Sequence, residues 1–185
     1  MLTTRQPGPG AELDPRYSDP GAEPTTWAAA VRRLAAAEVA WIVTVRPDGR
    51  PHATPMVPVV GPDAAYFHTG TGEVKYANLQ ADPRVIVLAG DTAWESGLDV
   101  VLEGVAAPVT DRTLLEEVAA LYRARWDGRW RLDVRDGALV NDGEGGVGSV
   151  LFEVRPTTAH AYAKGGPFGQ TRFRFRSSVR PRRTT

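Results

Sequence analysis

The chain has 185 residues, enough for one domain with a substantial core. Its formal net charge is zero, so no overall field attracts nucleic acid or an acidic membrane surface, and neither is expected as a partner. The absence of cysteine excludes disulfides, thiol nucleophiles and cysteine-ligated metals. No apolar run reaches the length of a membrane helix, and the first residues lack the pattern of a secretion signal, which predicts a cytoplasmic protein.

The two ends differ in composition from the middle of the chain. Residues 1–24 contain five prolines and few large apolar side chains, so we expect a flexible N-terminal arm. Residues 25–176 hold nearly all of the periodic apolar pattern and are predicted to form the folded domain. Residues 177–185 are expected to be a frayed basic tail.

The first predicted helix begins after an N-cap at Thr25 or Thr26. One of its faces is lined by Trp27, Val31, Leu34 and Ala35. The β-branched, mostly apolar segment Val39–Val45 predicts a buried strand. A Pro-Asp-Gly turn then returns the chain into a second strand over Pro51–Val60. The prolines of that strand cannot donate ladder hydrogen bonds, so one of its sides must be irregular or lie at an edge.

The next segments alternate between strands and one short helix. A third strand is predicted over 64–69, and a helix from Glu73 to Asp82 ends before the following proline, because the residue preceding a proline disfavours helical angles. Two further strands are predicted over 84–90 and 98–110, the second with a bulge at Gly104.

The last third of the chain starts with an amphipathic helix capped by Asp111. Its inward-facing residues are Leu114, Leu115, Val118, Leu121 and Tyr122. Strands are predicted over 149–154 and 157–165. Six or seven strands, few helices and no βαβ alternation predict a mainly β fold. We expect a six- to seven-stranded antiparallel β-barrel with a few helices.

One loop carries a candidate anion site. His68 to Val85 reads HTGTGEVKYANLQADPRV and places Lys75 just beyond a Gly/Thr loop, although the chain has only two lysines against twenty arginines. Such loops let backbone N–H groups approach an anion, and lysine supplies a compact charge where arginine supplies a planar fork. A phosphate site is one interpretation. The other is that both lysines are chance survivors of a bias toward arginine.

With these elements in place, the chain resembles a known family. The stretches AWIVTVRPDGRPHATPMVPVV, YFHTGTGEVKYANLQADPRV and DVVLEGVAAPVTD look, in order and spacing, like the split-barrel family of pyridoxamine 5′-phosphate oxidase-like flavin and deazaflavin proteins. The closing FGQTRFRF is similar to the TRWRF-type end segment of one actinobacterial branch. The resemblance implies an FMN-binding split-barrel fold and a homodimer with a flavin-type cofactor in each of two interface grooves.

The resemblance also assigns residues to the cofactor. Lys75 matches the lysine that contacts the cofactor phosphate, and the strand before it matches the one beside the phosphate and ribityl chain. The predicted cofactor-binding residues are Thr54, Pro55, Met56, His68, Thr69, Gly70, Lys75 and Arg172. Alternatives stay open for some of them: an ordinary strand threonine at Thr54, core packing for Met56 and a barrel-edge role for Arg172.

The chain departs from the vitamin B6 oxidase pattern within the family. That pattern has an arginine directly before the phosphate lysine, where this chain has Val74, and it has an FWQG-like segment that this chain lacks. The stretch KYANLQADPRV is closer to the branch whose members use coenzyme F420. The expected cofactor is therefore F420 or FMN, with F420 slightly favoured.

The implied function is an oxidoreductase that transfers a hydride between this cofactor and a small organic substrate, since the cofactor carries such chemistry. No catalytic residue stands out, and Tyr66, His68 or a bound water are the candidate proton donors. The three histidines are too dispersed to predict a metal site. Three alternatives stay open: an FMN-dependent enzyme like pyridoxamine phosphate oxidase, a non-catalytic flavin- or haem-binding protein, and an interaction protein with an empty groove.

Overall fold

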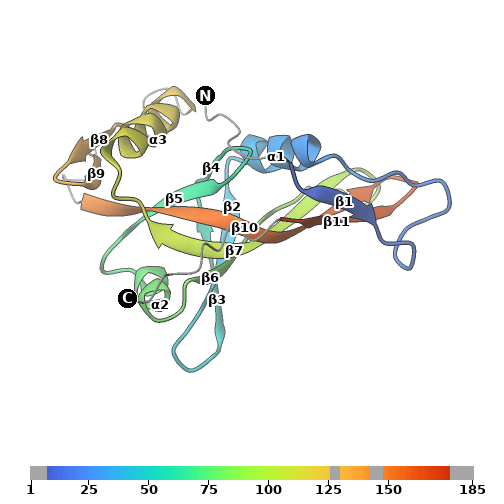
Figure 1. Ribbon diagram of the computed structural model, residues 1–185, viewed down its shortest axis with the longest axis horizontal. Helices are drawn as coiled ribbons and strands as arrows, with labels where there is room; N and C mark the ends of the chain where they lie inside the picture. The colour runs from blue at the N-terminus through green and yellow to red at the C-terminus, as the bar shows by residue number, and fades with distance from the viewer. Residues whose placement is uncertain (1–7, 126–129, 142–147, 176–185) are drawn as a thin grey trace, which may run out of the picture.

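Antiparallel strands carry most of the regular structure in the computed structural model, which describes residues 8–125, 130–141 and 148–175 (Figure 1). The helices of this part of the chain are α1 (Trp27–Ala36), α2 (Val74–Ala81) and α3 (Arg112–Arg125). The strands are β1 (Gly10–Leu13), β2 (Ala40–Val45), β3 (Pro51–Met56), β4 (Val59–Val60), β5 (Ala65–Gly70), β6 (Arg84–Ala89), β7 (Gly97–Pro108), β8 (Leu132–Arg135), β9 (Ala138–Asn141), β10 (Gly148–Lys164) and β11 (Gly169–Arg174). The prediction of a mainly β, antiparallel fold is confirmed, although the strands number eleven rather than six or seven. No helix within the described ranges is long and apolar enough to span a membrane.

All of these strands belong to one sheet, whose main path runs β1-β11-β10-β7-β6-β2-β3. Strand β10 is seventeen residues long and pairs with β7 along most of its length. Its other edge is shared: the segment from Ser149 to Val154 pairs with β5, and the segment from Thr158 to Ala163 pairs with β11. Residues 155–157 of β10, between these two segments, have no partner strand on this edge among the described pairings. The β8–β9 hairpin extends from the start of β10.

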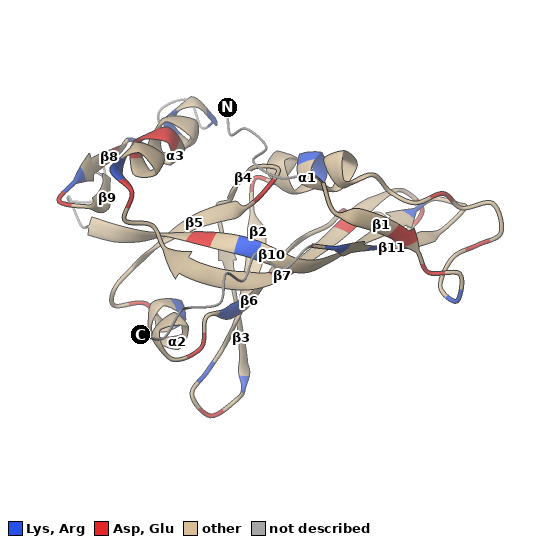
Figure 2. Ribbon diagram, in the orientation of Figure 1, with Lys and Arg blue, Asp and Glu red and all other residues tan. Residues whose placement is uncertain are grey.

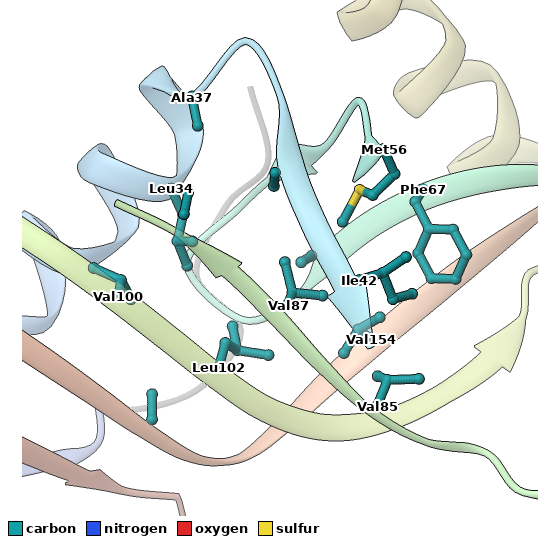
Figure 3. Close-up of a cluster of buried hydrophobic side chains, with 14 of the residues drawn as sticks. Leu34, Ala37, Ile42, Met56, Phe67, Val85, Val87, Val100, Leu102 and Val154 are labelled. Atoms are coloured by element: carbon teal, nitrogen blue, oxygen red, sulfur yellow. The ribbon is translucent and has the colours of Figure 1, made fainter. Parts of the chain in front are cut away.

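The larger hydrophobic core fills the space that the curled sheet encloses, and α1 covers one end of it (Figure 3). It is built from strand residues that alternate between the inner and outer faces. Its fully buried members include Leu34, Ile42, Phe67, Val87, Leu102 and Val154. Phe67 stacks on Phe152 from the paired strand with ring centroids 5.4 Å apart, which links β5 to β10 through side chains as well as backbone.

A smaller core lies on the opposite face of β5, under α3 and the β8–β9 hairpin. Leu115, Val118 and Tyr122 are the buried stripe of α3, as the sequence pattern predicted. Asp111 accepts a hydrogen bond from the Leu114 N–H at 2.8 Å, so the predicted N-cap of α3 is confirmed. Thr26 likewise caps α1.

Two strand boundaries differ from the prediction. The expected second strand over Pro51–Val60 is divided into β3 and β4, because the chain leaves the sheet around Pro58. The two strands expected over 149–154 and 157–165 are one strand, β10, which continues through Pro156 with a register shift between Pro156 and Thr158. Proline is tolerated at such an irregularity because no ladder hydrogen bond is required of it there.

The bulge predicted at Gly104 lies instead in the partner strand, at that register shift in β10. Gly104 instead allows the β10 backbone to approach β7 closely. A Cβ at this position would lie 2.5 Å from the Arg155 carbonyl oxygen and 2.9 Å from a Val154 methyl group. Only a residue without a side chain fits so near the neighbouring backbone.

The N-terminal arm differs most from its prediction. Gly10–Leu13 forms β1, which pairs with β11, and the segment after it is hydrogen-bonded to β11 and to the residue before that strand. The Asp14 N–H donates to the Gln170 carbonyl at 2.9 Å, and the Asp19 N–H donates to the Phe168 carbonyl at 2.8 Å. The edge of β11 offers backbone hydrogen bonds to this segment, although its composition provides few apolar side chains to bury. Residues 1–7 and the predicted tail 177–185 lie outside the described residues.

Charged side chains of both signs are interspersed along the described ribbon (Figure 2). Several are short-range pairs at turns, such as Asp48 with Arg50 and Asp82 with Arg84. Exposed pairs of this kind contribute little to stability.

We expect Gly104→Ala to lower the free energy of unfolding by about 1–3 kcal/mol, because the new methyl group overpacks against the β10 backbone. Urea denaturation measures the change. Gly10→Ala is the matched control, since a Cβ there has no neighbour within 4 Å. Equal stability of the two variants would show that β7 and β10 separate at no cost.

Candidate functional site

A cavity of about 510 Å³ lies where the ends of β3 and β5 meet the start of α2 and the β8–β10 region. This volume is within the range of small-molecule sites. Of the predicted cofactor-binding residues, the structure brings Pro55, Met56, His68, Gly70 and Lys75 to its wall. The wall residues that sequence reasoning missed are Val57, Glu73, Trp130, Asn141, Gly148 and Ser149.

Strand alternation decides which residues of β5 reach the cavity. Residues 66, 68 and 70 face α3, whereas residues 65, 67 and 69 face the larger core. His68 and Gly70 therefore line the cavity. Thr69 is 1% exposed, lies on the same face of the strand as Ala65 and Phe67 and is not part of the wall.

Strand β3, the last strand on the main path of the sheet, contributes residues to the cavity wall. Its only partner along the sheet path is β2, so its other edge carries no strand among the described residues. The chain leaves β3 at Met56, and Pro55, Met56 and Val57 line the cavity there. Thr54 pairs with Ile42 one residue earlier and does not reach the wall.

Arg172 is not brought to this cavity within one chain. It is exposed on β11, between Glu12 of β1 and His160 of β10 in the strand register. Strand β11 is flanked by β1 and β10, so Arg172 does not lie on an edge strand of the sheet.

His68 is held in one tautomer by its neighbours. Its Nδ1 lies 3.0 Å from the Ser149 Oγ, and the Ser149 hydroxyl donates its only hydrogen to the Leu139 carbonyl at 3.1 Å. Nδ1 must therefore carry the proton and donate it to Ser149, which leaves Nε2 with a lone pair. Burial lowers the pKa of His68 to about 4, against the opposing attraction of Glu73. The imidazole is neutral at physiological pH.

One aromatic ring, that of Trp130, lines the cavity beside His68. The His68 ring meets Tyr122 and Trp130 edge to face, at centroid distances of 5.2 and 5.5 Å. The Tyr122 hydroxyl donates to the Val57 carbonyl at 2.8 Å, which ties α3 to the chain just beyond β3. The missed Trp130 stands in a charged, aromatic connector whose sequence has no strand or helix pattern.

Lys75 is the second residue of α2 and is 7% exposed. Its ammonium group makes an ion pair with Glu73. The other Glu73 carboxylate oxygen, Oε1, accepts a hydrogen bond from the Gly70 N–H at 2.9 Å. Burial raises the pKa of Glu73, but the hydrogen bonds from Lys75 and Gly70 outweigh this effect and hold it below its usual value. Both predicted anion donors thus already contact a carboxylate of the same chain.

No group of three or more histidine, cysteine, aspartate or glutamate residues suited to a metal ion occurs in the described part of the chain.

The neutral state of His68 predicts a pH effect. The pKa falls from 6.5 in the unfolded chain to about 4 in the folded protein, so the unfolded chain binds more protons between these values. The free energy of unfolding is therefore independent of His68 protonation above pH 6.5. It decreases as the pH falls toward 4, by up to roughly 3 kcal/mol. NMR titration of the imidazole resonances checks this, with His68 assigned through its loss in His68→Gln. A His68 midpoint at 6.5 or above would contradict the buried, Ser149-bound imidazole.

Comparison with known proteins gives the family. The family model described as pyridoxamine 5′-phosphate oxidase matches residues 26–163. A search of curated proteins finds no match.

The fold is shared with a conserved hypothetical protein of Mycobacterium tuberculosis, at 22% identity and a TM-score of 0.61. The similarity covers 75% of this chain and 85% of that one. A FAD-binding protein of Mesorhizobium loti shares 15% identity with a TM-score of 0.54 and coverage of 80% and 95%. A haem-binding protein of Mycobacterium smegmatis shares 19% identity with a TM-score of 0.59 and coverage of 79% and 57%. On the extent of the family match, this chain belongs to the pyridoxamine 5′-phosphate oxidase-like split-barrel family.

Proposed function

We propose that the protein is an oxidoreductase that binds a flavin-type cofactor in the cavity and transfers a hydride to or from a small organic substrate. The observation that carries the proposal is a buried cation, Lys75, in the same cavity wall as the neutral imidazole of His68 and the ring of Trp130. Family membership and the FAD-binding relative with the same fold support it.

The cavity fits such a group in size and in chemistry. Its volume of about 510 Å³ suits a planar ring system. Lys75 suits the anionic end, since lysine binds phosphate as a flexible point charge. F420 is the favoured cofactor and FMN the second, on the sequence resemblance. The Glu73 carboxylate beside Lys75 is the one feature that does not match an anionic ligand.

The bound cofactor would supply the hydride chemistry. The protein's residues position it and keep water away. Met56, Val57 and Trp130 provide apolar wall, and His68 Nε2, which carries the lone pair, would accept a hydrogen bond from an N–H or O–H donor of the cofactor or substrate. Tyr66, the other candidate proton donor, is 6% exposed with its hydroxyl 3.3 Å from a Glu153 carboxylate oxygen, and it does not line the cavity.

Haem binding without turnover is a second candidate, favoured by the tautomer of His68. A neutral imidazole with a free lone pair is also the group by which histidine binds haem iron. The Mycobacterium smegmatis relative with this fold is a haem-binding protein. A Soret band in the purified protein, rather than a flavin spectrum, would favour this function.

We also propose that the protein is a homodimer. The outer face of the sheet exposes large apolar side chains, including Trp41, Val105 and Tyr162, which are 48%, 41% and 36% exposed. Trp41 lies beside Pro55 in the strand register, and Pro55 lines the cavity. An apolar face continuous with the cavity is typical of an interface.

Sedimentation tests the dimer. We expect a mass of about twice 20.0 kDa, and Trp41→Glu should shift the protein toward monomer because it places a charge in the apolar face. Trp94→Glu is the control, since Trp94 is 77% exposed and packs on Phe168 away from this face. A stable wild-type monomer at micromolar concentration would contradict the proposal.

Lys75→Met tests the cofactor site itself. Removing the buried cation should weaken F420 and FMN binding by about tenfold to a hundredfold, the loss expected for one charged hydrogen bond. Isothermal titration measures it. Lys164→Met is a matched control, because the Lys164 side chain is only 10% exposed and pairs with Asp99 outside the cavity. Unchanged binding in Lys75→Met would place the anionic end of the cofactor elsewhere.

A further inference from the structure

Glu73 occupies the position that an anionic ligand would take. One carboxylate oxygen pairs with Lys75, and the other accepts from the Gly70 N–H at 2.9 Å. These are the two donors that the Gly/Thr loop and the lone lysine were expected to offer a phosphate. We propose that Glu73 is a specificity residue that selects against a terminal phosphate dianion at this end of the cavity. The inference rests on the proposed function, and it deepens it.

The charge balance of the wall supports this role. Lys75 is the one lysine or arginine among the described residues that line the cavity, and Glu73 is the one acidic residue. The pair therefore leaves no net charge for a ligand, since His68 is neutral. A phosphate monoester brings two negative charges and must either displace the carboxylate from both donors or lie beside it. Like charges at such short range repel strongly inside a protein.

Glu73 is poised to compete rather than merely to cap the loop. Its lowered pKa keeps it ionised at neutral pH. Its side chain is 49% exposed and Lys75 is 8% exposed at the side chain, so the cation is accessible chiefly from the side of the carboxylate. A ligand end with one negative charge or none meets less repulsion there. A phosphodiester carries one charge and riboflavin carries none, whereas FMN ends in a dianion.

The test separates the charge of Glu73 from its hydrogen bond. Glu73→Gln keeps an oxygen that can accept from the Gly70 N–H and removes only the charge. Glu116→Gln is the matched control, because Glu116 also pairs with a cation, Arg112, but lies on the exposed side of α3. Affinities for FMN and riboflavin, which differ only in the phosphate, are measured by titration on each protein. Inorganic phosphate is titrated separately by ³¹P NMR at constant ionic strength.

We expect the wild type and Glu116→Gln to bind FMN and riboflavin with affinities within about tenfold of each other, since the carboxylate offsets the gain from Lys75. In Glu73→Gln the preference for FMN should rise by at least about tenfold, and inorganic phosphate should bind at least about tenfold more tightly than to the wild type. Glu73→Gln combined with Lys75→Met should lose both gains, because the phosphate then has no cation to meet.

Equal phosphate affinity in the wild type and Glu73→Gln, including no binding by either, would overturn the inference, as would a wild type that prefers FMN over riboflavin by a hundredfold or more. Failure of the proposed function looks different: no flavin or deazaflavin binds any variant. The phosphate titration still decides the role of Glu73 in that case.

Discussion

The pairing of β10 with four other strands is the constraint on which the rest of the structure depends. Its first residues pair with both β5 and β9, so Ser149 comes to lie beside His68 and the β8–β9 hairpin is fixed above them. Its second half pairs with β11, which in turn holds β1. The cavity forms at the point where β10 begins, because β5 ends there and the chain turns away into α2. A shift of this strand by one residue would exchange its two faces and remove Ser149 from His68.

The strands and helices could largely be predicted, because their patterns are local. The β-branched run of β2, the Asp111 cap and the stripe of α3 each depend on neighbouring residues only. The continuity of β10 through Pro156 could not be predicted, since it depends on β7 leaving room at Gly104. The attachment of residues 10–13 is another non-local effect. Their sequence has few apolar side chains, and the partner they require lies at the far end of the chain in β11.

The candidate site was predicted in part for the same reason. Pro55, Met56, His68, Gly70 and Lys75 stand in segments whose pattern resembles a known family, and all five line the cavity. Trp130, Asn141 and Ser149 come from segments more than fifty residues further on, and no local signal relates them to the loop. Glu73 had a signal, an acidic residue two positions before the lysine. The sequence does not show that this side chain also accepts a hydrogen bond from the Gly70 N–H, which the structure does.

The lysines themselves explain why a rare residue is an incomplete guide to a ligand site. Lys164 is not part of the cavity wall, yet its ammonium group is also paired, 3.0 Å from an Asp99 carboxylate oxygen and 2.6 Å from the Asp91 carbonyl. Both lysines thus occupy narrow places where a compact ammonium group meets a carboxylate, and the wider arginine fork would need more space. Internal pairing accounts for the choice of lysine at both positions without any ligand. What distinguishes Lys75 is that its partner lies in a cavity wall, so a ligand and Glu73 must compete for the same charge. The chemistry of the site is therefore set by the pair, and the lysine alone does not define it.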